Sequence, residues 1–123
     1  MAYHPINLFV RFLLEVAALI SLGIWAWYTF NDWQGWVMAI LLPLGMAVIW
    51  GVFAVPGDPS RSGSAPVPVH GILRLAIELL FFGCMVWALY DLGWHGTALV
   101  LGLITLIHYL VSYERVVWLI TRK

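Results

Sequence analysis

The sequence has few charged residues and almost no cysteine. Charged side chains make up 10% of its 123 residues and hydrophobic side chains 63%, whereas a typical soluble domain is about 25% charged. Most of the surface therefore faces something other than water. The only cysteine, Cys84, lies within an apolar run, which excludes a disulfide framework or a thiolate metal site. The six basic and six acidic side chains balance, so nothing indicates a nucleic-acid partner.

The sequence also lacks the patterns that usually mark a cofactor or metal site. Its four histidines, His4, His70, His95 and His108, are scattered without the spacing of metal ligands. We find no phosphate-binding glycine loop, dinucleotide fingerprint, nucleophile elbow or pair of haem ligands. We therefore predict neither a metal nor a cofactor, and whether the protein is an enzyme stays open.

Four long apolar stretches are the dominant feature of the chain. They cover residues 8–30, 36–55, 71–92 and 97–120. The hydrocarbon core of a bilayer, about 30 Å thick, is crossed by roughly 20 helical residues. No Lys or Arg precedes Leu8, so we expect the first stretch to be a mature helix and not a cleavable signal. The pattern predicts an all-α integral membrane protein, a four-helix bundle whose main partner is the lipid bilayer.

A polar segment divides the chain into two transmembrane hairpins, residues 1–56 and 71–123. Residues 56–70 contain four prolines and three serines, which disfavour a helix. We therefore expect 57–70 to be an exposed, extended cytoplasmic linker.

The basic residues are predicted to lie on one side of the membrane. Arg61 lies in the linker, Arg122 and Lys123 end the chain, and the short loops around 31–35 and 93–96 contain no Lys or Arg. The positive-inside rule predicts a multi-pass protein of the cell membrane with both termini in the cytoplasm. An aromatic belt is expected at the opposite interface, made of Trp25, Trp27, Tyr28, Trp33, Trp36, Trp87, Tyr90 and Trp94.

The two halves of the chain resemble each other. Arg11-Phe-Leu-Leu-Glu15 matches Arg74-Leu-Ala-Ile-Glu78 at an offset of 63, and Trp33-Gln-Gly35 matches Trp94-His-Gly96 at an offset of 61. This internal repeat predicts two duplicated hairpins of the same orientation, with the two R-x-x-x-E helices facing each other.

These motifs also carry a resemblance to a known family. The R-x-x-x-E openings, the segment Trp50-Gly51-Val52-Phe53-Ala54-Val55-Pro56 and Phe81-Phe82-Gly83 after Glu78 resemble the YrdB-like family of small bacterial four-helix membrane proteins. The resemblance covers nearly the whole chain and implies the fold. Because the family has no established activity, it implies no catalytic residues.

The candidate site consists of charged groups inside the predicted helices, where ionisable side chains are costly and are the default functional candidates. Arg11 and Glu15 share one helix face, as do Arg74 and Glu78. A crossed pairing, Arg11 with Glu78 and Arg74 with Glu15, is an alternative. Two hypotheses remain open: a salt-bridge cluster that joins the hairpins, or a cavity in which a glutamate exchanges protons.

Two further residues are candidates for binding or proton exchange. His108 falls near the middle of the fourth stretch, where it is either a hydrogen-bonded packing residue or a proton relay. Trp50 either packs in the bundle or walls a ligand pocket. We expect Glu114 and Arg115 to extend toward water at the cytoplasmic interface, and Asp91 and His95 to form a solvated cap.

Three hypotheses about function follow. The protein binds or transports a small molecule or ion, with Glu15 and Glu78 binding a proton or a cationic substrate; a bundle this small would need to form a homodimer to enclose a path. Alternatively, it is a membrane-embedded acid/base enzyme for a lipid-soluble, hydrophobic ligand, or a structural accessory subunit. The repeat, the buried charges and the lack of a soluble domain favour binding or transport.

Overall fold

The computed structural model describes residues 3–58 and 65–122. The helices are α1 (Pro5–Thr29), α2 (Trp33–Val52), α3 (Gly71–Asp91), α4 (His95–Val111) and α5 (Tyr113–Thr121). Two short strands, β1 (Phe53–Ala54) and β2 (Val67–Pro68), pair in parallel. Helices α1, α2 and α3 are each long and apolar enough to cross a membrane, and α4 with α5 would make a fourth span. The prediction of a largely helical chain is thus confirmed, with three or four helices long and apolar enough to cross a membrane.

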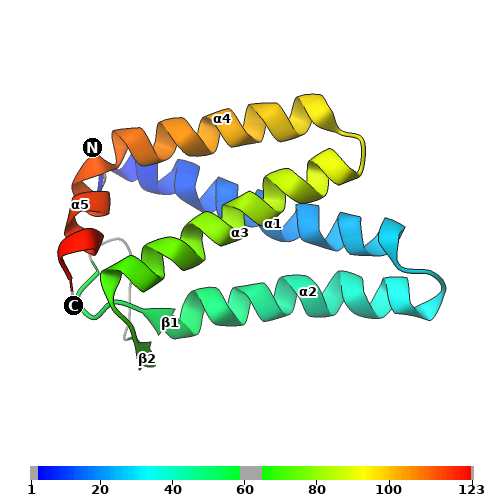
Figure 1. Cartoon of the computed structure of the whole chain (residues 1–123), viewed down its shortest axis with the longest axis horizontal. Helices are drawn as coiled ribbons and strands as arrows, with labels where there is room; N and C mark the ends of the chain where they lie inside the picture. Colours follow the sequence, from blue (N-terminus) through cyan, green and yellow to red (C-terminus); the bar gives the residue numbers. More distant parts are fainter. Residues whose placement is uncertain (1–2, 59–64, 123) are drawn as a thin grey trace.

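Helices α1 and α3 form the centre of the molecule, and α2 and α4 flank them (Figure 1). The α1–α2 and α3–α4 turns lie at one end of the helices, whereas the chain termini, α5 and the strands lie at the other. The two helices that carry R-x-x-x-E therefore face each other, as predicted.

The core follows from the helical spacing of small and large apolar residues on these central helices. The buried face of α1 repeats every three or four positions, as an α-helix requires. It packs against a bulky buried face on α3. The buried core residues are Leu14, Ala18 and Leu22 of α1, Phe81, Phe82, Met85, Ala88 and Leu89 of α3, and Ala98 of α4. In α2, by contrast, only Gly35 is buried, so most of this apolar helix faces outward.

The fourth apolar stretch is not the continuous helix that we predicted. Helix α4 ends at Val111, and α5 turns away from it by 70° after Ser112. The turn directs Arg115 and Leu119 of α5 inward, and both are buried. Helix α5 packs against α3 so closely that a Cβ atom on Gly71 would overlap the carbonyl of Leu119. The Gly71 amide also donates to the Arg122 carbonyl at 3.0 Å.

The described part of the linker is largely exposed and extended, as predicted, with Asp58 as the exception. The start of the linker folds back onto the helices, so Asp58 is buried, as is Val55 just before it. Strand β1 pairs with β2, and the Val69 amide donates to the Ala54 carbonyl at 2.9 Å. The exception has an electrostatic cause, because Asp58 bonds to a buried arginine described below. The predicted positions of Arg61 and Lys123 lie outside the described residues.

Candidate functional site

Glu78 is the centre of a buried charge cluster. The cluster lies at the end of the molecule where both chain termini are found (Figure 1). The side chain of this α3 residue is fully buried. Its Oε2 atom lies 3.0 Å from Nη2 of Arg11 and 2.8 Å from Nε of Arg74. The hydroxyl of Tyr109, on α4, donates to Oε1 at 2.7 Å. One carboxylate thus joins side chains from three helices.

Arg115 completes the cluster from α5. It donates to both oxygens of Glu78 at 2.8 Å, and its Nη2 donates to Oδ2 of Asp58 at 2.7 Å. The expected extension of Arg115 toward water is therefore wrong: the residue is 2% exposed. A guanidinium satisfies two carboxylates at once through its planar set of donors, and the bend between α4 and α5 brings it to them.

Arg74 joins α3 to the end of α2. Its Nη1 donates to the backbone carbonyls of Trp50 and Phe53, which lie in the last turn and at the C-cap of α2. These carbonyls have no partner within their helix and carry its partial negative charge, so a cation there is stabilising. The guanidinium carbon also lies 4.4 Å from the ring centroid of Trp50.

Trp50 connects the charge cluster to the apolar core. Its ring packs against Phe81 and Phe82, with centroids 4.7 and 5.6 Å away. Arg11 approaches the same ring at 5.3 Å. The ring therefore lies between guanidinium groups and the core, which agrees with the packing interpretation; a role in ligand binding stays a prediction.

Glu15 differs from Glu78, its counterpart in the sequence repeat. Nε of Arg11 donates to Glu15 at 3.3 Å, and the Glu15 side chain remains 25% exposed. Of the crossed pairing, the contact between Arg11 and Glu78 is formed. Arg11 thus bonds within its own helix and across to α3. The charge cluster, which we define as Arg11, Glu15, Asp58, Arg74, Glu78 and Arg115, contains three positive and three negative side chains when all are ionised.

His108 belongs to a separate buried chain of hydrogen bonds. Its Nδ1 lies 3.1 Å from Oδ1 of Asn7, and Nδ2 of Asn7 donates to Oγ of Ser112 at 2.7 Å. All three residues are buried. The chain links the start of α1 to the break between α4 and α5, which agrees with the hydrogen-bonded packing interpretation of His108; its role as a proton relay stays a prediction.

Sequence reasoning missed Asp58, Tyr109 and Asn7. The exposed linker predicted from the composition includes Asp58, and the signal for a buried partner is an acidic residue beside the apolar Trp50–Pro56 segment. Asn7 and Ser112 lie 105 positions apart, and nothing local in the sequence relates them. Asp91 and His95 are both exposed, in agreement with the predicted solvated cap, and Nε1 of Trp25 donates to Oδ2 of Asp91 at 2.8 Å. His95 stacks on Tyr90 with ring centroids 4.1 Å apart.

Comparison with known proteins agrees with the motifs of this site. The family model described as "Protein of unknown function (DUF2568)" matches residues 9–106, which include all of the charge cluster except Arg115. The chain belongs to this family. It is 46% identical over 116 residues to the uncharacterized protein YrdB of Bacillus subtilis (strain 168), which covers 94% of each chain. No solved structure matches.

Membership of the family confirms the resemblance carried by R-x-x-x-E and the Trp50–Pro56 segment, and assigns no chemistry. What the site can do follows from its groups. Among the described residues, no set of three or more His, Cys, Asp and Glu side chains is placed to hold a metal ion. Three guanidinium groups contact Glu78, and neutralising its carboxylate would leave them without their shared partner. Among the described residues, Glu15 pairs with Arg11 and is partly exposed, so neutralising it disturbs fewer contacts.

Proposed function

We propose that the protein binds and exchanges a small ion at the charge cluster, and that this ion is a proton. Glu15 is the exchanging group, and Glu78 is the fixed counter-charge that holds the three arginines. The observation that carries this proposal is the difference between two glutamates at equivalent positions of the repeat. Glu78 is fully buried among Arg11, Arg74, Arg115 and Tyr109, whereas Glu15 is one-quarter exposed and, within the described part of the chain, pairs with Arg11.

The arrangement of the chain in the membrane is part of this proposal. We take α1, α2, α3 and the bent pair α4–α5 as four spans of a bundle built from two duplicated hairpins, residues 1–56 and 71–123. The absence of Lys and Arg from both short loops favours cytoplasmic termini. The charge cluster is then on the cytoplasmic side. A homodimer would supply the walls that a single four-span chain lacks for a path across the membrane.

The test is proton flux in liposomes that contain the purified protein, with a pH gradient and a fluorescent pH indicator inside. The parent protein is expected to carry flux, and Glu15→Gln is expected to abolish it while remaining folded. Glu114→Gln is the matched control, because it removes an exposed carboxylate on α5, and it should leave flux unchanged. Flux that persists in Glu15→Gln, or a parent that carries none, contradicts proton exchange at this residue.

A second candidate function is a structural accessory role, in which the charges serve assembly alone. The observation that favours it is the bonding of Arg74 and Arg115, whose donors reach carboxylates or helix-end carbonyls on several elements. In this case, the charge cluster fixes the bend of α5 and the end of α2. The absence of flux, together with a large loss of stability when Arg115 is removed, would favour this role.

A further inference from the structure

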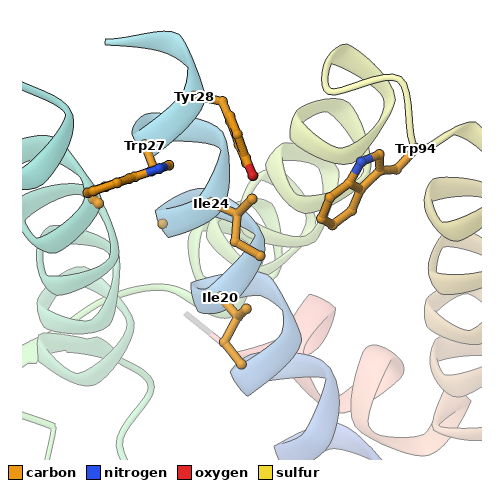
Figure 2. A pocket seen from close by; sticks show the side chains of 7 residues that line it. Ile20, Ile24, Trp27, Tyr28 and Trp94 are labelled. Atoms are coloured by element: carbon orange, nitrogen blue, oxygen red, sulfur yellow. The ribbon is translucent and has the colours of Figure 1, made fainter. Parts of the chain in front are cut away.

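A groove on the outside of α1 lies at the far end of the helices from the charge cluster. It has a volume of about 410 Å³, runs over Ile20, Gly23 and Ile24, and is bounded by Trp27, Tyr28, Ala39 and Trp94. Figure 2 shows the Tyr28 hydroxyl directed along the groove beside Ile24, with Trp94 approaching from the α3–α4 turn. We call this feature the aromatic groove. Its apolar floor and aromatic walls suit a hydrophobic group.

A second hollow continues the aromatic groove toward the end of the helices. Its volume is about 400 Å³, and it shares Tyr28 and Trp94 with the first. Its remaining lining residues are Thr29, Asp91 and Leu92, so a carboxylate lies where the apolar lining ends. The bond from Trp25 holds Asp91 in place. The two hollows together are amphipathic. We call the apolar part over Gly23 and Ile24 the trough, and the part beside Asp91 the mouth.

The electrostatics of the mouth favour a cation. Thr29 is the last residue of α1 and Asp91 the last of α3, and neither helix has a basic residue in its last turn. Two helix C-termini therefore direct their partial negative charge to the place where Asp91 carries a full one. The α1–α2 and α3–α4 turns contain no Lys or Arg that would neutralise it. A bound cation would supply the missing positive charge.

The rings at the mouth add a second reason for a cation. Tyr28 and Trp94 line both hollows, and the face of an aromatic ring attracts ammonium groups, most strongly when the site is shielded from water. Trp27 is held edge-on against Trp36 of α2, with ring centroids 4.5 Å apart, and forms the wall on that side. An inorganic cation would use the carboxylate but not the apolar trough.

We propose that the aromatic groove binds a lipophilic organic cation, an amine or quaternary ammonium that carries an alkyl or aryl tail. The cationic head pairs with Asp91 and lies against the rings of Tyr28 and Trp94, and the tail occupies the trough over Gly23 and Ile24. This site is distinct from the charge cluster, because Tyr28 is 17 positions beyond Arg11 on α1, about 25 Å along a helix. It does not rest on the proton exchange proposed above.

The test measures binding of tritiated tetraphenylphosphonium to the protein in nanodiscs of zwitterionic lipid, relative to empty nanodiscs. We expect saturable binding, with affinity reduced at least tenfold in Asp91→Asn and in Trp94→Leu. Asp32→Asn is the matched control: Asp32 is the acidic residue of the α1–α2 turn and does not line either hollow. Its affinity should equal that of the parent. Tetraphenylborate, of the same shape and opposite charge, should show no saturable binding.

Several results would overturn the proposal. One is no binding above empty nanodiscs, and others are equal effects of the Asp91 and Asp32 variants or equal binding of the anion. Circular dichroism checks that each variant is folded, and Tyr28→Leu replaces Trp94→Leu if the latter is not. Glu15→Gln should leave binding unchanged. If it abolishes binding while Asp91→Asn does not, the cation binds at the charge cluster, and the groove proposal alone fails.

Discussion

Arg115 donates hydrogen bonds to both carboxylate oxygens of Glu78, each at 2.8 Å, although 37 positions separate the two residues. This pair joins α5 to α3 and places both side chains out of contact with solvent. The 70° turn after Ser112 directs Arg115 inward to this contact. The turn is therefore part of the site and not an irregularity at the end of the chain.

Replacing Arg115 with Leu should destabilise the protein by about 3–5 kcal/mol, because Glu78 and Asp58 then lose a shared buried partner. The free energy of unfolding can be measured in mixed micelles with rising dodecyl sulfate, followed by circular dichroism. Arg122→Leu is the control, since Arg122 is exposed and its guanidinium stacks on Trp118 at 4.8 Å. It should cost about 0.5–1 kcal/mol. Similar losses in the two variants would argue against a structural role for Arg115.

The two glutamates of the repeat should respond differently to neutralisation. Glu78→Gln removes the charge that three arginines share and should cost about 3–5 kcal/mol. Glu15→Gln removes a partly exposed partner of Arg11 and should cost about 1 kcal/mol or less. The same unfolding measurement compares them. Equal costs would mean that Glu15 is held as firmly as Glu78, and the basis for assigning exchange to Glu15 would be lost.

Gly71 should not tolerate a side chain. Its Cβ would overlap the backbone carbonyl of Leu119, and backbone cannot rotate away, so Gly71→Ala should cost about 1–3 kcal/mol. Gly83→Ala is the matched control on the same helix, because no atom lies within 4 Å of its added Cβ. Because alanine is a better helix former than glycine, Gly83→Ala should stabilise the protein by about 1 kcal/mol. A Gly71→Ala protein as stable as Gly83→Ala would show that α5 does not pack at this distance.

The buried chain Ser112–Asn7–His108 should be energetically coupled. Asn7→Ala leaves both neighbours without this partner and should cost about 1–3 kcal/mol. A double-mutant cycle of Asn7→Ala with Ser112→Ala should give a coupling energy of about 0.5–1 kcal/mol or more. Additive effects within error would indicate that the hydrogen bond between Asn7 and Ser112 does not fix the start of α1 to the α4–α5 break.

The sequence by itself predicted the first three long helices, and it singled out four of the six residues of the charge cluster, Arg11, Glu15, Arg74 and Glu78. Spans of about 20 apolar residues have few alternatives to a helix in a bilayer, because every backbone amide must be satisfied within the segment. Arg11 and Glu15, or Arg74 and Glu78, share a helix face through the four-residue period alone. The two matching R-x-x-x-E motifs led us to predict that α1 and α3 face each other, and these helices are in contact.

What only the tertiary structure decided is how these groups combine. The R-x-x-x-E repeat is symmetric in the sequence, yet Glu78 is fully buried and Glu15 is not, because Asp58, Tyr109 and Arg115 surround the end of α3. Local periodicity determined which residues share a face, since that depends on neighbours along one helix. Partners such as Asp58 and Arg115, 57 positions apart, were decided by the folding-back of the linker and the turn of α5. The positions of the linker and of α5 depend on how buried positive and negative side chains pair across the end of the molecule that holds the charge cluster.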